Sequence, residues 1–301
     1  MKKIINSIFG LIILSALFLT SCGSTSPSSD RRPVILTSTT FLADIARNIA
    51  GDRLTVESLL PIGVDPHAYQ PTPQDAAKVA DSKLLIVNGM GYEQFIAPLL
   101  ENAGGERKVI EASAGISPRE DAGGEQGVDP HMWLDPNLVI RYVENIRDGL
   151  IKFDPDGEAV YRSNAEAYIA QLKELDTWIV EQISQIPAER KLLITNHEAL
   201  GYFAERYGFT IAGAVIESFS SGASPSAGQM ADLIAQIKAS GAPAIFLDAS
   251  DNEALARQIA AETNVRVVTD LHLESLTDGA PAATYIDMMK HNVTRIVEAL
   301  K

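Results

Sequence analysis

The sequence predicts an α/β protein of two lobes, each a mainly parallel sheet flanked by helices, joined by one long rigid helix between the lobes. Short apolar runs that alternate with helical patterns are typical of parallel strands covered by helices on both faces. This alternation occurs twice along the chain, and a single apolar helical stripe of about 30 residues separates the two series. We therefore predict a first lobe over 34–153, a linking helix over 154–186 and a second lobe over 187–301.

The first lobe begins with an apolar strand over Pro33–Thr37 and a helix over Thr40–Ala50 that ends at Gly51. Asp135 and Pro136 have the residue types of an N-cap and a first helical residue, which predicts a helix that runs to about residue 152. Between these elements we expect strands over Leu54–Leu60, Lys83–Asn88 and Lys108–Glu111, helices over Pro73–Ala80 and Tyr92–Asn102, and a Gly-rich polar loop over Ala114–Asp129.

The linking helix shows the longest apolar stripe in the chain. It begins at Asp154-Pro155, ends before Pro187, and carries apolar side chains at spacings of three and four residues. At ~1.5 Å per residue it is on the order of 45 Å long, enough to run along both lobes. The second lobe then continues with strands over Lys191–Thr195, Ala244–Asp248 and Arg266–Thr269, a helix between each pair, and a closing helix over Tyr285–Leu300.

The N-terminus has the pattern of an export signal. Lys2 and Lys3 precede an apolar stretch that ends in Leu19-Thr20-Ser21-Cys22, which is similar to a bacterial lipobox. We predict a lipoprotein signal peptide over 1–21, lipidation of Cys22, and a flexible Ser/Gly/Pro-rich tether over 22–33. The alternative is a signal anchor with a chance cysteine. The prediction is an exported protein, lipid-anchored to the cell membrane on a periplasmic or outer-surface face.

Composition excludes several classes of protein. With 301 residues, 46% hydrophobic and 21% charged, the chain is neither collagen-like, nor a coiled-coil rod, nor disordered. The formal charge is −14, from 25 Lys+Arg and 39 Asp+Glu, and no basic stretch offsets it, so we expect no nucleic-acid partner. The single cysteine excludes an internal disulfide and a zinc site built on thiolates.

Ligands of a parallel α/β sheet are expected beyond the carboxyl ends of strands, and four side chains beside strand ends or turn prolines are candidates. His67 and His131 each complete an Asp-Pro-His tripeptide, His197 follows a predicted strand, and Asp270 ends the strand over Val265–Thr269. Proline stiffens the loop before each of the first two histidines, which suits a metal ligand. Taken singly, each histidine also fits an ordinary solvated loop residue, so the residues alone leave the metal site open.

The remaining candidates are weaker. His272 lies two residues beyond Asp270 and is an alternative to it, whereas His291 falls on the polar side of the closing helix. Glu217 and Asp248 fit either carboxylates of the cleft or structural caps. The stretch that begins at His197 lacks the second histidine of a zinc-protease helix, so that chemistry is absent.

Several motifs in register resemble the zinc- and manganese-binding solute receptors of bacterial ABC importers. The motifs are the lipobox, Pro66–Pro73, Asp129–Pro136, Asn196–Phe203, Val268–Leu271 and the terminal stretch from Tyr285 to Asn292. The resemblance implies a receptor and not an enzyme, monomeric, with a divalent metal held between the lobes by His67, His131, His197 and Asp270. It also implies a membrane permease of a metal ABC importer as the partner.

The ligand chemistry that the resemblance implies favours Zn²⁺ as the transported ion, with Mn²⁺ as the alternative. Three imidazoles and one carboxylate suit Zn²⁺, whereas Mn²⁺ prefers more oxygen ligands. Manganese-type members of the family commonly carry glutamate at the position of His197. Against zinc, the polar loop over Ala114–Asp129 contains no histidine, although zinc-dedicated relatives often have a His-rich loop there. Since imidazoles bind metal only when neutral, acid below about pH 6 should weaken the affinity.

Four protein ligands would leave no open position for a reactive water, so such a site stores metal. Asp129 and Asp135 are candidates to hydrogen-bond the ligands from outside. Two other functions remain open on the sequence: a lipid-anchored surface adhesin or scaffold, and an exported metallohydrolase with an open coordination position. Participation of His272 or Glu217 in the site is also left open.

Overall fold

The computed structural model describes residues 32–105, 107–119, 127–221 and 224–301. The predicted signal peptide over 1–21, the lipidation site Cys22 and nearly all of the tether over 22–33 lie outside these residues. Within the described ranges, no helix combines the length and the apolar character that a membrane crossing requires.

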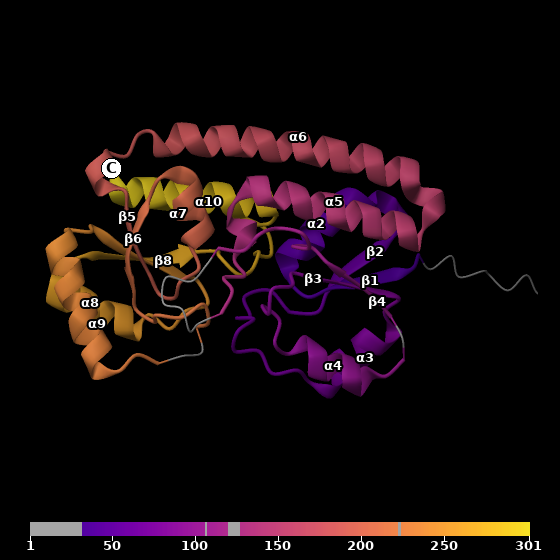
Figure 1. The fold of residues 1–301 in the computed structure, drawn as a ribbon, viewed down its shortest axis with the longest axis horizontal. Coiled ribbons are helices and arrows are strands. Elements are labelled where there is room, and N and C mark those ends of the chain that lie inside the picture. Colours follow the sequence, from indigo (N-terminus) through magenta and orange to yellow (C-terminus); the bar gives the residue numbers. More distant parts are fainter. Residues whose placement is uncertain (1–31, 106, 120–126, 222–223) are drawn as a thin grey trace, which may run out of the picture. The chain divides into compact units, whose positions relative to one another are not determined.

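Two sheets of four parallel strands form the framework (Figure 1). The first has the order β2-β1-β3-β4, and the second has the order β6-β5-β7-β8, so each lobe repeats the same arrangement of its strands. All adjacent strands pair in parallel. The strands are β1 (Val34–Thr37), β2 (Thr55–Ser58), β3 (Leu84–Val87), β4 (Lys108–Glu111), β5 (Leu192–Thr195), β6 (Thr210–Ala214), β7 (Ala244–Asp248) and β8 (Arg266–Leu271). The predicted fold class is confirmed.

Helices cover both sheets. Those of the first lobe are α2 (Thr40–Ala50), α3 (Pro73–Asp81), α4 (Ile96–Ala103) and α5 (Pro136–Phe153). Those of the second lobe are α7 (Gly201–Tyr207), α8 (Ala227–Ser240), α9 (Ala254–Thr263) and α10 (Tyr285–Leu300). Short 3-10 turns occur over Gly51–Arg53, Met132–Leu134, Pro155–Gly157 and Ala188–Arg190. Asp135 caps α5 as predicted, because its carboxylate accepts the N–H of Asn137.

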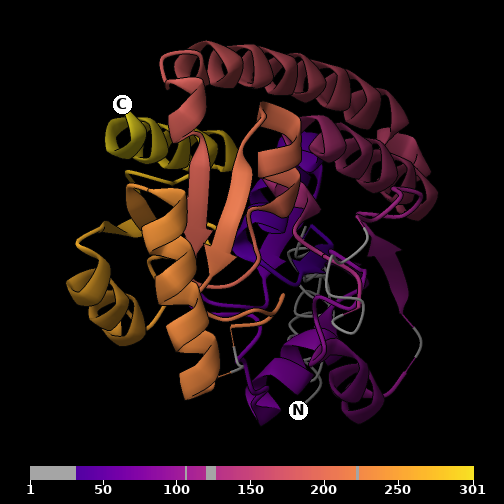
Figure 2. The same ribbon diagram turned by 60° about the vertical axis from the view of Figure 1, so that its left-hand side comes forward.

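The linking helix is α6 (Glu158–Ile183), which passes over both sheets in Figures 1 and 2. All seven positions of its apolar stripe are buried: Tyr161, Ala165, Tyr168, Leu172, Leu175, Ile179 and Ile183. They pack on α2 and α5 of the first lobe and on α10 of the second. One hydrophobic core therefore extends beneath α6, with Ile35 and Leu84 of the first sheet and Leu193 and Phe246 of the second as members.

Two local predictions were incomplete. Strand β6 was not predicted, because its sequence Thr-Ile-Ala-Gly-Ala is short and weakly apolar, and it lies at a sheet edge with a register shift opposite Leu193 and Ile194. Helix α4 begins at Ile96 and not at Tyr92, since Gly89, Met90 and Gly91 all have positive φ and turn the chain away from helical geometry. Tyr92 thereby becomes a loop residue.

Candidate metal centre

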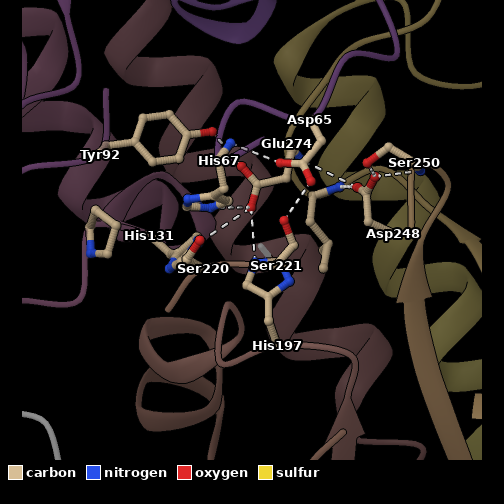
Figure 3. A network of polar contacts seen from close by, with 12 residues as sticks. Asp65, His67, Tyr92, His131, His197, Ser220, Ser221, Asp248, Ser250 and Glu274 are labelled. Carbon is tan, nitrogen blue, oxygen red and sulfur yellow. Dashed lines mark hydrogen bonds and ion pairs between the residues drawn. The ribbon is translucent and has the colours of Figure 1, made fainter. Parts of the chain in front are cut away.

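Three imidazoles surround one carboxylate where the loops of the two sheets meet (Figure 3). The group consists of His67, His131, His197 and Glu274, and the potential ligand atoms all lie within 4.8 Å of one another. Glu274 Oε1 is 3.6 Å from Nε2 of His67, 3.3 Å from that of His131 and 3.2 Å from that of His197. It is the one group of this kind among the residues that the structure describes.

The two Asp-Pro-His tripeptides form the same turn. The N–H of His67 donates to Asp65 Oδ1 over 2.8 Å, and the N–H of His131 donates to Asp129 Oδ1 over 3.0 Å. In each case the aspartate carboxylate closes a turn on the backbone two residues further on, as Asp does in Asx turns. The repeated tripeptide therefore forms the same Asx turn twice, and each turn directs an imidazole into the site.

His131 is also held through its side chain. Its Nδ1 lies 2.9 Å from Asp129 Oδ1, and the other Asp129 oxygen accepts a hydrogen bond from Arg119 over 3.0 Å. Burial lowers the pKa of His131, but its contacts with Asp129 and Glu274 outweigh that effect and raise the pKa to about 9 in the metal-free protein. Asp129 thus contacts a ligand as expected, whereas Asp135 caps α5.

Asp270 does not lie in this group, and its expected place in the site is wrong. Strand β8 continues to Leu271, so Asp270 is a strand residue and not the first residue of a loop. Its side chain is 48% exposed and pairs with Arg295 of α10 over 2.8 Å. The fourth member, Glu274, was missed. The one local signal was that Glu274 is the only acidic residue between Leu271 and Leu276, which does not by itself favour it over Asp270.

Both lobes hold Glu274 in place. In its own lobe, the N–H groups of Leu273 and Glu274 donate to Asp248 Oδ2 over 2.5 and 3.2 Å. From the first lobe, the Tyr92 hydroxyl donates to Glu274 Oε2, and Trp133 Nε1 donates to the carbonyl of Leu273 over 2.7 Å. Asp248 is therefore a structural support of the site.

The charge on Glu274 is stabilised by its neighbours. Burial would raise the pKa of this carboxyl, but its close contacts with the imidazoles of His131, His197 and His67 hold the pKa well below its usual range. The side chain is 2% exposed, so the carboxylate presents a buried negative charge to the three imidazoles. A cation is the natural partner for such a charge.

The other candidates lie elsewhere. The rings of His272 and His291 pack on each other at 5.3 Å, and His291 Nε2 contacts the carbonyl of Asp270 over 2.7 Å. The backbone N–H of His272 donates to Asn292 Oδ1. Glu217 is exposed and lies 3.5 Å from Gln229 Nε2. None of these side chains belongs to the described group of four.

The distances from Glu274 to the three imidazoles match the ligand separations of a tetrahedral metal site. Ligands placed about 2.1 Å from one ion in a tetrahedron are about 3.4 Å apart. The three separations from Glu274 Oε1, 3.2 to 3.6 Å, bracket that value. Nε2 of His67 and Nε2 of His131 are buried without a hydrogen bond of good geometry, so both nitrogens are available to a metal.

Two parallel sheets, a linking helix and this buried group define a two-lobe metal-binding receptor of the solute-binding class. Residues 35–299 match the family described as ZnuA, zinc-uptake complex component A, periplasmic, and the chain belongs to this family. Its relatives are substrate-binding proteins of metal transporters, and the protein is likewise a binding protein and not an enzyme.

Named relatives support the same class. The manganese-binding lipoprotein MntA of Halalkalibacterium halodurans is 37% identical, covering 100% of this chain and 99% of the relative. The periplasmic zinc-binding protein TroA of Treponema pallidum has a TM-score of 0.83 at 29% identity, covering 89% of this chain and 99% of that one. The manganese-bound periplasmic metal-binding protein of Candidatus Liberibacter asiaticus has a TM-score of 0.79 at 30% identity, with 89% and 100% covered.

Proposed function

We propose that the protein is an extracytoplasmic receptor that binds one divalent transition-metal ion at His67, His131, His197 and Glu274. It delivers this ion to the permease of a metal ABC importer. The observation that carries the proposal is the convergence of three buried imidazole nitrogens on Glu274 Oε1 at the spacing of tetrahedral ligands. Four protein ligands suit capture of an ion, because they leave no coordination position for a reactive water.

Zn²⁺ is the ion that this donor set favours, and Mn²⁺ is its competitor. Three nitrogen donors and one oxygen donor match the usual composition of zinc sites, and affinity for nitrogen-rich sites rises from Mn²⁺ to Zn²⁺. The names of the relatives favour Mn²⁺, since MntA and the Candidatus Liberibacter asiaticus protein are described with manganese, whereas TroA is described with zinc. The preference for Zn²⁺ therefore depends on the donor set of this chain.

Capture joins the two lobes. His67 and His131 belong to loops of the first lobe, and His197 and Glu274 to loops of the second, so a bound ion connects them. The core shared beneath α6 opposes a wide opening between the lobes, which leaves small tilts and loop movements for release. The receptor acts as a monomer, anchored by lipid at Cys22 after export, with the domain boundaries predicted from the sequence.

Metal analysis and competition titration test this function. Full-length mature protein purified without chelator should contain about one metal ion per chain, and Zn²⁺ should displace Mn²⁺ in a titration. The variant His197→Ala should lose stoichiometric binding. His291→Ala is the matched control, since His291 lies outside the group of four and should leave binding unchanged. Stoichiometric binding by His197→Ala would contradict the proposed site, and full Mn²⁺ occupancy undisturbed by Zn²⁺ would overturn the preference for zinc.

A further inference from the structure

The two oxygens of the Glu274 carboxylate have different partners (Figure 3). Oε1 faces the three imidazoles at 3.2 to 3.6 Å. Oε2 accepts a hydrogen bond from the hydroxyl of Tyr92. Both side chains are 2% exposed, so water does not compete freely for either oxygen. One oxygen is thus directed at the ligand group and the other is engaged outside it.

The backbone fixes the position of Tyr92. The three residues before it, Gly89, Met90 and Gly91, have φ values of 89°, 55° and 77°, and Met90 adopts this region although it has a side chain. The carboxylate of the following residue, Glu93, accepts hydrogen bonds from Ser38 Oγ over 2.6 Å and from the N–H of Gly89 over 3.2 Å. The loop is therefore tied to the end of the first sheet, and the Tyr92 hydroxyl is held at one point.

The aromatic ring of Tyr92 is fixed as well. It meets the ring of His67 edge-on at 5.2 Å and packs on Trp133 at 4.8 Å. On the opposite side of the carboxylate, Asp248 holds the backbone of Glu274 through the N–H groups of Leu273 and Glu274. Rotation of the carboxylate toward a two-oxygen mode would leave a buried hydroxyl without its acceptor, which is unfavourable.

We propose that Tyr92 is a positioning residue that restricts Glu274 to one-oxygen coordination and so favours Zn²⁺ over Mn²⁺; this inference rests on the proposed function. With Oε2 engaged by Tyr92, the protein offers four donors, three nitrogens and one oxygen. Four donors complete the coordination of Zn²⁺. Mn²⁺ prefers a larger number of oxygen donors, and the second carboxylate oxygen is the nearest one that the site contains.

The variant Tyr92→Phe tests the proposal, because it keeps the ring and removes the hydroxyl. We expect the ratio of Zn²⁺ affinity to Mn²⁺ affinity, measured by competition titration, to fall about tenfold, as is usual when a partner outside the ligands is lost. X-ray absorption of the Mn²⁺-loaded variant should show one more oxygen donor than in wild type. The control is Tyr161→Phe, which removes a hydrogen bond from another buried tyrosine to a carboxylate, that of Asp154, outside the group of four.

The outcomes separate this inference from the proposed function. If wild type and Tyr161→Phe bind one ion and Tyr92→Phe changes both the affinity ratio and the number of donors, the proposal holds. If Tyr92→Phe binds both ions with the wild-type ratio and donor number, the role of Tyr92 is overturned while the receptor function stands. The proposed function would instead be overturned if the wild type binds no metal, or if His197→Ala binds metal as well as the wild type does.

Discussion

The two lobes have the same strand order but fix their metal-ligand candidates in different ways. In the first lobe, His67 and His131 are each oriented by an aspartate only two residues away. In the second lobe, Glu274 depends on Asp248 and Tyr92, which are 26 and 182 residues distant in the sequence. A local turn can be recognised from its residues, whereas a side chain supported by distant contacts cannot.

The two Asx turns differ in where their second oxygen points. Asp129 Oδ2 accepts from Arg119, while its other oxygen contacts His131 a second time through Nδ1. Asp65 Oδ2 accepts instead from Ser221 of the second lobe over 2.5 Å. The carboxylate of Asp129 therefore stabilises its own histidine, whereas the carboxylate of Asp65 connects the two lobes beside the site.

The largest expected effect distinguishes Glu274 from Asp270. Glu274→Gln should lower Zn²⁺ affinity by more than ~100-fold, because loss of a ligand exceeds the 10- to 100-fold cost of losing an outer partner. Asp270→Asn, the matched control, should stay within about twofold of wild type, since Asp270 pairs with Arg295 on the surface. Competition titration measures both variants. A larger loss of affinity in Asp270→Asn than in Glu274→Gln would show that Asp270, and not Glu274, is the fourth metal ligand.

Metal loading should raise the free energy of unfolding, because the bound ion connects the two lobes. At a free Zn²⁺ concentration of about 1,000 times Kd, binding to the folded state alone adds about 4 kcal/mol to the free energy of unfolding. Thermal unfolding of loaded and metal-free protein at equal concentration gives the difference. His197→Ala should lose most of this shift, and a shift of wild-type size in that variant would show that the ion stabilises the fold from another site.

The stability of the metal-free protein should fall as the pH rises. The carboxylates of Asp129 and Glu274 outweigh the opposing effect of burial and raise the pKa of His131 from 6.5 to about 9, so protonated His131 stabilises the folded state fully below pH 6.5. This contribution, about 3 kcal/mol at most, disappears as the pH passes through 9. Urea unfolding at pH 6.5 and 9 measures it.

Two controls accompany the pH measurement. Asp129→Asn removes one partner of His131 and should reduce the difference between the two pH values. In the Zn²⁺-loaded protein His131 is neutral, so its proton no longer contributes and metal binding itself strengthens with pH. Metal-free wild type that is at least as stable at pH 9 as at pH 6.5 would contradict this account of His131.

The smallest expected effect compares the two Asx turns. Asp129→Asn should weaken Zn²⁺ binding by about 10- to 100-fold, because Asp129 supports both the backbone and the ring of His131. Asp65→Asn should cost less than tenfold at equilibrium, since Asp65 supports only the backbone of His67, and it should speed metal release by weakening the contact with Ser221. Stopped-flow release into a chelator, together with titration, separates the two effects. Equal losses in both variants would show that the second contact of Asp129 has no consequence.

The sequence by itself determined the α/β class, the two series of elements, the linking helix and three members of the candidate site. The apolar stripe of α6 has a fixed helical period, and its seven positions are buried as predicted. The histidines could be found because stiff Asp-Pro-His turns and a strand end are local features.

Only the tertiary structure decided the fourth member and its surroundings. Strand β8 extends past Asp270, which turns that side chain toward Arg295, and the following loop places Glu274 among the imidazoles. Its supports, Tyr92 and Asp248, come from the loop after β3 and from the end of β7. Strand length and loop path are set by packing between distant segments, so the residues near Asp270 contained no local pattern from which this choice could be made.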